Sequence, residues 1–472
     1  MKRNSQTISR RMFLGATSIG LPATIAGATL AGTTRAAEAA ANGLFATTQL
    51  RGSVNAAEFG LLPGTIDDQS HLLQTALNRA AEDDKPIFLP PGTYFVSNIT
   101  LPARTRLSGV AGATRLVFAG GGHFLFSENA RHVELNGLVI DGANRGVESY
   151  AEASLRISNA DHAVIENCQI LGSVEKGIHI DRSRGRIARS SVTGAGGDCG
   201  IYALENRGLS ITDNEVSACS NGGILVHRWQ AGEDGTIVTG NRVFNIGALN
   251  GGTGQWGNGI NVFRAHSVMI ANNHIGDCAF SAIRSNAGSN VQITGNHCLR
   301  SGETAIYSEF EFVGAMIANN VVDGGARGIS ITNFMQGGRM AVCSGNLIRN
   351  IRTTAPYVDP DHPFGDGISA EADTTITGNV IENAERFGLM LGWGPYLRDV
   401  VATSNVIRGS QTGVYVSVVE GSGNTVISDN IISGSSKGAV VGYRWKDAVT
   451  GDLTRDGNEH FDHLAIERNR IS

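Results

Sequence analysis

The sequence predicts an all-β fold, a single-stranded parallel β-helix in which each coil of chain stacks on the coil before it. Two short motifs that alternate along residues 131–472 are the main observation. The first is an apolar residue, two others, an asparagine, one other and a second apolar residue, as in Ile211 to Val216. The second is a small residue followed by a short apolar strand, as in Gly223 to Val226. Short strands that recur every 22 to 39 residues, with turn residues between them, indicate a solenoid.

The asparagine motif predicts a structural ladder. It has thirteen copies, in which Cys168 and Ser190 replace two of the asparagines. The apolar residues on either side would point into the coil and stack on their copies above and below. Asparagine tolerates the backbone angles of a tight turn, and stacked amides can hydrogen-bond along the axis. The asparagine positions are Asn136, Asn214, Asn241, Asn273, Asn296, Asn320, Asn346, Asn379, Asn405, Asn430 and Asn469.

The small residue of the second motif defines which side chains face outward. Side chains alternate between the two faces of a strand, so the first and third residues after it point inward. The second and fourth then form two columns on the outer face. These columns are rich in Tyr, His, Arg and carboxylate side chains. The small residues are Gly177, Gly200, Gly223, Gly259, Ala282, Ala305, Gly328, Gly367, Gly388, Gly413 and Gly438.

Composition excludes several classes of protein. The chain has 472 residues, of which 41% are hydrophobic, enough to form a core. The first 36 residues carry five basic side chains and no acidic one, and the remaining 33 basic and 43 acidic residues give a net charge of −10. So acidic a protein is not expected to bind nucleic acid. Six cysteines do not make a disulfide scaffold, and pairing of Cys199 with Cys219 or Cys168 stays open.

The N-terminal segment, residues 1–36, is predicted to be an export signal. Its sequence from Ser9 to Leu14 reads Ser-Arg-Arg-Met-Phe-Leu and precedes a mild apolar run that ends near Leu30. The segment resembles a bacterial twin-arginine signal, with Gly15 where a lysine is common. The resemblance implies a periplasmic or secreted protein that meets the twin-arginine translocase during export. An ordinary secretory signal and an uncleaved anchor are the alternatives.

Residues 50–130 are predicted to hold an N-terminal cap and the first coils. After Asp67-Asp68, apolar residues with helical spacing predict a capping helix, and a Pro-Pro-Gly-Thr-Tyr turn follows from Pro90. This stretch resembles the opening of pectate-lyase-superfamily β-helices, which implies a right-handed coil; crossover connections are also generally right-handed. With the export signal and the repeats, the whole chain resembles the twin-arginine-translocated repeat proteins. That resemblance implies an architecture and no particular activity.

The candidate site lies on the outward columns, beside two long insertions at residues 244–258 and 350–366. Insertions on one side of a solenoid usually build its binding face. Aromatic side chains there would stack on sugars, and charged ones would contact uronates or transfer protons. The alternative explanation is that such residues only keep an exposed sheet soluble. The catalytic candidates are His227, Arg284, Tyr307, Glu309 and Glu371, and the substrate-binding candidates are Tyr202, Trp256, Asn261, Arg264 and Trp393.

The predicted distance between two carboxylates limits the reactions that this site could catalyse. Glu309 and Glu371 share a column two coils apart, so their backbones should be about 9.6 Å apart. That separation suits an inverting glycosidase and not a retaining one. For a lyase or epimerase acting on uronic acids, Arg284 would neutralise the carboxylate and Tyr307 or His227 would carry the proton.

No cofactor or metal site is predicted. Asp359, Asp361 and His362 could bind a cation such as calcium, but solvated acids in a proline-rich loop explain them as well. Three functions therefore stay open. The first is a carbohydrate-active enzyme on an acidic polysaccharide, a lyase or epimerase before a hydrolase. The second is a non-catalytic envelope or glycan-binding repeat protein, and the third is a purely structural rod.

Overall fold

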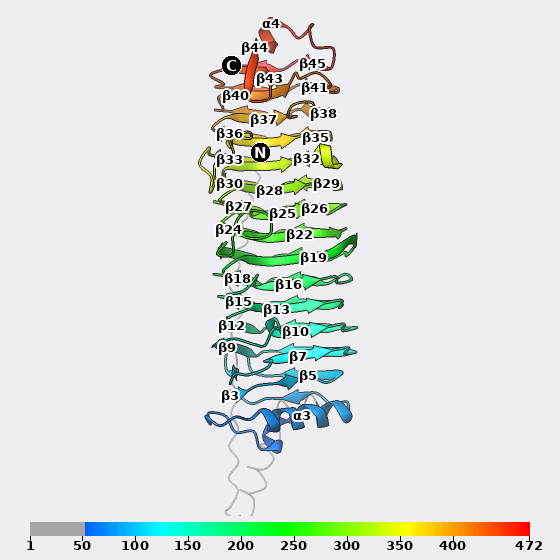
Figure 1. Cartoon of the computed structure of the whole chain (residues 1–472), viewed down its shortest axis with the longest axis vertical. Coiled ribbons are helices and arrows are strands. Elements are labelled where there is room, and N and C mark those ends of the chain that lie inside the picture. The colour runs from blue at the N-terminus through cyan, green and yellow to red at the C-terminus, as the bar shows by residue number, and fades with distance from the viewer. Residues whose placement is uncertain (1–51) are drawn as a thin grey trace, which may run out of the picture. The chain divides into compact units, whose positions relative to one another are not determined.

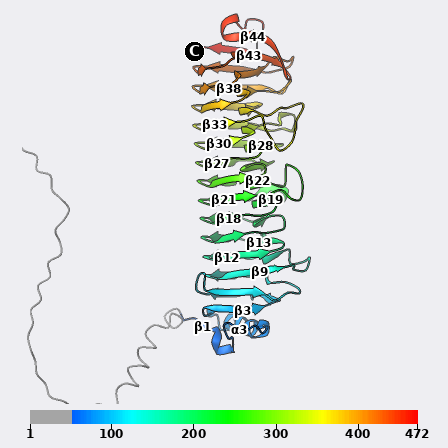
Figure 2. The same ribbon diagram turned by 90° about the vertical axis from the view of Figure 1, so that its left-hand side faces the viewer.

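The computed structural model describes residues 52–472, so the predicted export signal lies outside the described residues. These residues form a parallel right-handed β-solenoid, which confirms the predicted fold class (Figure 1). Each coil contributes one strand to each of three long sheets, A, B and C. Strands from successive coils pair in parallel, and the coils stack along one axis (Figure 2).

The three sheets contain 16, 15 and 15 strands. Sheet A consists of β1 (Val54–Asn55), β2 (Ile87–Phe88), β5 (Arg104–Ser108), β8 (His132–Asn136), β11 (Ala163–Glu166), β14 (Gly185–Ala188), β17 (Ser210–Thr212), β20 (Ile237–Thr239), β23 (Met269–Ala271), β26 (Val291–Thr294), β29 (Val313–Ala318), β32 (Arg339–Ser344), β35 (Ala372–Thr377), β38 (Arg398–Thr403), β41 (Thr425–Ser428) and β45 (Leu464–Glu467). Sheet B consists of β3 (Gly92–Val96), β6 (Thr114–Phe118), β9 (Val139–Arg145), β12 (Gln169–Ser173), β15 (Ser191–Thr193), β18 (Glu215–Ser217), β21 (Arg242–Ile246), β24 (His274–Cys278), β27 (His297–Leu299), β30 (Val321–Gly325), β33 (Leu347–Ile351), β36 (Val380–Ala384), β39 (Val406–Arg408), β42 (Ile431–Ser433) and β46 (Arg470–Ile471).

Sheet C carries the strands that begin near the predicted small residues. It consists of β4 (Ile99–Thr100), β7 (Leu125–Glu128), β10 (Ala153–Ser158), β13 (Lys176–Asp181), β16 (Ile201–Leu204), β19 (Gly222–Glu233), β22 (Asn258–His266), β25 (Ile283–Asn286), β28 (Thr304–Glu309), β31 (Arg327–Ile331), β34 (Asp366–Ala370), β37 (Phe387–Leu391), β40 (Thr412–Ser417), β43 (Gly438–Arg444) and β44 (Asp447–Asp452).

The core fills the inside of the coils. On sheet C, the first residue after each small residue pairs with its copy on the next coil, as Ile283 does with Ile306 and Ile306 with Ile329. All three side chains are fully buried, which confirms the predicted inward column. Close packing between coils explains why this position holds a small residue. A Cβ on Gly367, for example, would come within 2.5 Å of the carbonyl oxygen of Gly388.

The asparagine ladder is present from Asn214 to Asn469. At each interior rung, the side-chain amide donates to the side-chain oxygen of the next rung and to a carbonyl of the preceding coil. The prediction that the asparagine itself adopts the unusual backbone angles of the turn was wrong. The left-handed conformation belongs to the residue before each rung, as at Asp213 (φ 56°) and Asn319 (φ 58°), and not to the asparagine. The ladder amide is thereby left free to bond along the axis.

Short helices and a hairpin complete the two ends. Helix α3 (Ser70–Glu82) buries Leu73, Ala76, Leu77 and Ala80 and lies where the capping helix was predicted. The other end carries β44, which pairs antiparallel with β43, and the short helix α4 (Leu453–Asp456). Two 3₁₀ helices lie at η1 (Ala56–Phe59) and η2 (Phe334–Gln336). None of the helices in residues 52–472 is long and apolar enough to span a bilayer.

Candidate functional site

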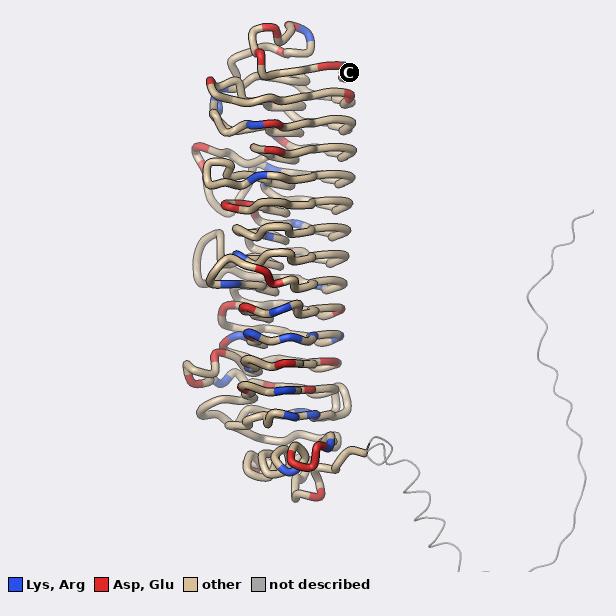
Figure 3. The backbone as a smooth tube through the Cα atoms, turned by 90° about the vertical axis from the view of Figure 1, so that its right-hand side faces the viewer, with Lys and Arg blue, Asp and Glu red and all other residues tan. Residues whose placement is uncertain are grey.

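Two long loops border the outer face of sheet C. Residues 247–257 lead into β22 and residues 352–365 lead into β34, so both loops lie along the same side of the solenoid. In the backbone view, these loops project beyond the regular coils (Figure 3). The register there also matches the sequence prediction, because Tyr307 pairs with Ser330 and Ser330 with Ser369.

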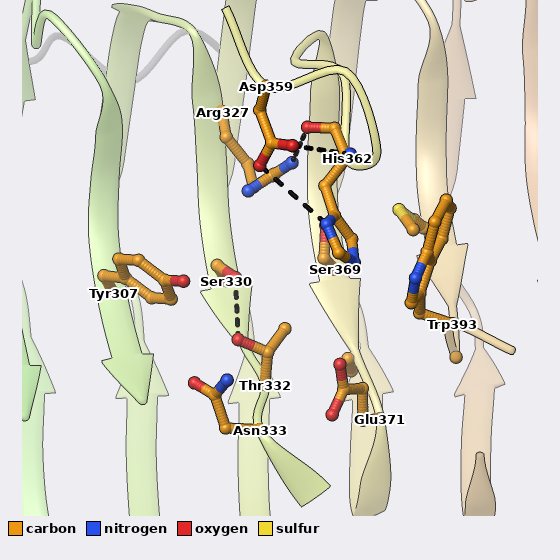
Figure 4. Close-up of a pocket in the computed structure, with 13 residues that line it drawn as sticks. Tyr307, Arg327, Ser330, Thr332, Asn333, Asp359, His362, Ser369, Glu371 and Trp393 are labelled. Carbon is orange, nitrogen blue, oxygen red and sulfur yellow. Dashed lines mark hydrogen bonds and ion pairs between the residues drawn. The ribbon is translucent and has the colours of Figure 1, made fainter. Parts of the chain in front are cut away.

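A cavity of about 200 Å³ opens on sheet C beneath the loop 352–365. Tyr307, Ser330 and Ser369 form its floor, one from each of three successive coils. Glu371 and Trp393 lie toward the C-terminal coils, and the loop above contributes further polar side chains (Figure 4). The lining residues are Tyr307, Arg327, Ser330, Thr332, Asn333, Asp359, His362, Ser369, Ala370, Glu371, Met390, Gly392 and Trp393.

Glu371 is the carboxyl group of this cavity with the most strongly altered acidity. Burial raises its pKa to about 7, and this effect outweighs the backbone N–H groups that favour the charged form. One of these, the N–H of Phe334, donates to Oε2 at 2.6 Å. The left-handed Asn333 (φ 73°) turns the chain into η2 and so points that N–H at the carboxylate. A carboxyl group with a pKa near 7 can both accept and donate a proton at neutral pH.

Tyr307 lies across the cavity from Glu371, two coils away along the axis. Burial, with a smaller contribution from Glu309, raises the pKa of the Tyr307 phenol, so the hydroxyl stays protonated at neutral pH. The Arg284 guanidinium lies over the ring, 4.8 Å from its centroid. Figure 4 shows the hydroxyl directed toward Ser330 and the middle of the cavity. Tyr307 can therefore supply a proton to a group bound there.

One side of the cavity is formed by Arg327, which belongs to a buried group of charged side chains. Arg327 Nε lies 3.1 Å from Asp366 Oδ2, and Arg386 Nη1 lies 3.9 Å from Asp366 Oδ1. Asp366 is completely buried, so one carboxylate faces two guanidinium groups. Arg327 also lies over the ring of Phe364, at 5.2 Å. Arg327 lines the cavity beside the carboxyl groups of Asp359 and Glu371, and among the lining residues its guanidinium is the group that an anionic ligand could pair with.

The loop over the cavity is held by its own side chains. Asp359 Oδ1 accepts hydrogen bonds from the backbone N–H groups of Asp361 (3.1 Å) and His362 (2.9 Å). The His362 ring packs against Trp393 with centroids 4.3 Å apart. Burial lowers the pKa of His362, which favours the neutral ring. Asp359 therefore stabilises the loop, and residues 52–472 contain no group of three or more His, Cys, Asp or Glu side chains arranged to hold a metal ion.

A second opening of about 530 Å³ adjoins this cavity toward the C-terminal end. The two share Asn333, His362, Glu371 and Trp393. The β43–β44 hairpin contributes Trp445, which meets Trp393 edge to face at 5.6 Å. We call the two openings together the Glu371 groove. Its remaining lining residues are Met335, Asp361, Tyr396, Trp445, Lys446 and Asp447.

Arg284 and Glu309, two of the predicted catalytic residues, bond to each other instead of facing this groove. Arg284 donates to both carboxylate oxygens of Glu309, at 2.6 and 2.8 Å, and Asn286 donates to one of them at 2.9 Å. The two residues are 5% and 1% exposed. Glu309 and Glu371 therefore do not act as the predicted pair of carboxylates. Glu309 is already paired with Arg284, and only Glu371 lines the groove.

Glu303 joins the Arg284–Glu309 pair to both loops. Its carboxylate accepts hydrogen bonds from Thr253 in the first loop (2.5 Å) and from Tyr357 in the second (3.0 Å). Arg284 lies 3.7 Å from Glu303 and donates to Thr253 Oγ1 at 2.6 Å. This buried network connects the two loops across the face of sheet C.

The other predicted residues lie further toward the N-terminus. Tyr202, His227 and Asn261 line a separate cavity of about 220 Å³. Arg264 is exposed, donates to the carbonyl of Trp229 at 2.9 Å and lies over Phe263. Trp256 is half-buried in the first loop and lines none of the three cavities. Of the predicted residues, the structure thus places only Tyr307, Glu371 and Trp393 together in the Glu371 groove.

Sequence reasoning missed Arg327, Asp366 and Arg386. Arg327 and Asp366 come one residue before the small residue of their coils, and their strands are paired there. A third outward column, at that position, would have shown the opposite charges on adjacent coils. His362 was considered only as a cation ligand, and nothing in the sequence indicates its packing on Trp393.

Comparisons with known proteins agree with this fold. The family described as "Right handed beta helix region" matches residues 116–257 and 176–337. The family described as "Periplasmic copper-binding protein (NosD)" matches residues 364–460. Among curated proteins, no relative matches the chain.

Solved structures show the same architecture. An N-terminal fragment of bacteriophage phi29 gene product 12 is 17% identical with a TM-score of 0.52, over 86% of this chain and 71% of that one. The catalytic unit of an alpha-1,3-glucanase from Streptomyces thermodiastaticus is 15% identical with a TM-score of 0.47, over 89% of this chain and 69% of that one. At such low identity, the likeness concerns the fold and not the activity.

The side chains of the segment that matches the copper-binding family do not fit a copper site. Residues 364–460 contain no cysteine, one histidine (His460) and one methionine (Met390). Copper in proteins is held mainly by imidazole, thiolate and thioether groups. The match therefore concerns the coil repeat and not a set of metal ligands.

Proposed function

We propose that this chain is an extracytoplasmic carbohydrate-active protein that binds an acidic polysaccharide in the Glu371 groove and acts on it as a lyase or epimerase. The observation that carries the proposal is the Glu371 carboxyl group. Its pKa is raised to about 7, and it lies between the aromatic side chains of Tyr307 and Trp393. Aromatic faces bind sugar rings, and a group that titrates near neutral pH is suited to proton transfer.

Arg327 supports a uronic acid as the substrate. Its guanidinium lines the cavity and can pair with the sugar carboxylate. Such pairing makes the proton on the adjacent carbon, C5, more acidic. In this proposal, Arg327 takes the neutralising role that the sequence had indicated for Arg284.

In the lyase reaction, the Glu371 carboxylate removes the C5 proton. The electrons of the C5–H bond form the C4–C5 double bond, the bond from C4 to the glycosidic oxygen breaks, and Tyr307 donates its proton to that oxygen. In the epimerase reaction, Tyr307 returns a proton to C5 from the opposite face and no bond between sugars breaks. Both reactions need an acid and a base, and Figure 4 shows Tyr307 and Glu371 on either side of Ser330, so each can reach a sugar bound between them.

The proposed location rests on two sequence features. One is the segment that resembles a twin-arginine signal, and the other is the match of residues 364–460 to a family described as periplasmic. Twin-arginine export carries folded protein and would deliver the solenoid outside the cytoplasm.

The test is a screen of the purified protein against alginate, polygalacturonate and glycosaminoglycans. Lyase activity appears as absorbance of the unsaturated uronate, epimerase activity as exchange of the C5 hydrogen in D₂O, and hydrolysis as reducing ends without that absorbance. We expect lyase or epimerase turnover, with kcat/KM lowered at least 100-fold in Glu371→Gln. Because Glu371 acts as the base, kcat/KM of the native protein should rise as the pH increases through about 7.

The matched control is Glu382→Gln, which makes the same change on an exposed side chain of strand β36 in sheet B. It should leave turnover unchanged. Full turnover in Glu371→Gln would contradict the assignment of the base. If a polymer binds but no assay detects a product, the proposed reaction is contradicted. The protein would then be a non-catalytic glycan-binding protein.

A further inference from the structure

A separate cavity lies on sheet C toward the N-terminus, under the first loop. It has a volume of about 220 Å³, and four of its lining side chains are aromatic rings. Three of these rings stack in a row, because Tyr202 packs on His227 (5.3 Å between centroids) and His227 packs on Phe263 (5.6 Å). The row continues outside the cavity, where Tyr202 also packs on His179 (4.9 Å). The lining residues are Tyr202, His227, Trp229, Gly254, Gln255, Asn261, Phe263 and Asn286.

The lining of this cavity carries no net charge. Its polar groups are the amides of Gln255, Asn261 and Asn286, the Tyr202 hydroxyl and the His227 ring. Burial lowers the pKa of His227 to about 3 and raises that of the Tyr202 phenol, so both are neutral at physiological pH. Rings and amides without a charged group suit the C–H faces and hydroxyl groups of an uncharged sugar. The cavity thus differs from the Glu371 groove, where carboxyl and guanidinium groups gather.

Two buried polar atoms of the lining lack hydrogen-bond partners. They are Nε2 of His227 and Oδ1 of Asn261, and their side chains belong to residues only 6% and 3% exposed. An unsatisfied buried polar atom costs about 1–3 kcal/mol, so such atoms usually mark a place for a ligand or water. The Asn261 amide holds the loop above by donating to Gly254 O at 3.2 Å. Ligand hydroxyl groups entering beneath Gly254 would satisfy both atoms.

The cavity and the Glu371 groove lie on one face but are separated. Asn261 lies on β22 and Glu371 directly follows β34, so the two are four coils apart, about 19 Å along the axis. The buried network of Arg284, Glu303 and Glu309 lies between them and joins both loops. We infer that this cavity is a second binding site, which takes an uncharged sugar ring stacked on Trp229. The site does not depend on the reaction proposed for Glu371.

The test uses maltohexaose, cellohexaose and chitohexaose as probes, with binding measured by calorimetry and by saturation-transfer NMR. We expect at least one probe to bind the native protein. Trp229→Ala should weaken that binding at least tenfold, and because Trp229 is 62% exposed the variant should fold normally. Asn261→Ala should have the same effect, with the folding of that variant checked by circular dichroism.

Two further variants locate the bound sugar. Glu371→Gln and Trp445→Ala, both in the Glu371 groove, should bind the probe like the native protein. Unchanged binding in Trp229→Ala, or loss of binding in Trp445→Ala, would overturn the inference. Absence of binding to all three probes would overturn it as well, and none of these results would alter the activity screen on acidic polymers.

Discussion

One interior rung of the asparagine ladder provides a direct test of what holds the solenoid together. The Asn320 side chain donates to Ile293 O and to Asn346 Oδ1, both at 3.0 Å. Its oxygen accepts from the backbone and side-chain amides of Asn296, at 2.9 and 3.0 Å. All four bonds are buried. The substitution Asn320→Ala removes them without disturbing the backbone conformation, because the left-handed residue is Asn319.

The expected loss follows from these four bonds. Each is worth a net of about 1 kcal/mol, so Asn320→Ala should lower the free energy of unfolding by about 4 kcal/mol. The terminal rung is the matched control. Asn469 makes three such bonds, at 2.8–3.0 Å, in a half-buried position where water can replace them. Asn469→Ala should therefore cost about 1–2 kcal/mol.

Urea unfolding followed by circular dichroism measures both losses. Asn320→Ala should lower the free energy of unfolding clearly more than Asn469→Ala does. A loss below about 1 kcal/mol for Asn320→Ala, or equal losses for the two variants, would show that the ladder amides exchange for water at no cost. The inward apolar column would then account for the cohesion of the coils.

Three further predictions concern the charged and thiol side chains. Arg284→Met leaves the buried Glu309 carboxylate without its counter-ion and should lower the free energy of unfolding by about 3–5 kcal/mol. Adding Glu309→Leu should restore part of the loss, because Glu303 also loses its nearby cation but keeps its bonds to Thr253 and Tyr357. A single variant as stable as the native protein would contradict this. The pKa of Glu371 is raised from 4.5 to about 7, so the folded state binds its proton more tightly and this group's contribution to stability should fall as the pH rises through that range. Urea unfolding at pH 5 and pH 8 should show a smaller difference in Glu371→Gln, and an unchanged difference would refute the assignment. All six cysteines are free and buried with raised pKa values, so a thiol reagent should label them only after unfolding, and rapid labelling of native protein would count against the fold.

The sequence was sufficient to predict the coil because its determinants are local. Alternating apolar residues, an asparagine slot and a small residue repeat within each coil, and their spacing alone sets the register. That register correctly placed Tyr307 above Ser330 and Ser330 above Ser369. It also identified the side of the solenoid on which both long loops lie.

Whether an individual outward side chain is buried, paired or open to a ligand depends on contacts between coils, and the spacing of residues in the sequence does not reveal these contacts. The register that brings Arg284 and Glu309 onto adjacent strands also allows them to bond to each other, which buries both. The proline-rich loop 352–365 has no repeat pattern, so the packing of His362 on Trp393 could not be derived from it. The pKa of Glu371 likewise depends on burial by neighbouring coils.

The antiparallel strand β44 has a consequence for how these molecules associate. A stack of parallel strands ends in open backbone groups, onto which the first coil of another molecule could add. In the described residues, β44 covers the last strand of sheet C with the opposite chain direction, and helix α3 packs against β2 to β5 at the other end. The hydrogen-bonding pattern of an antiparallel edge does not match that of a parallel coil. End-to-end addition of another molecule is thereby opposed at sheet C, whereas β45 and β46 are the last strands of sheets A and B.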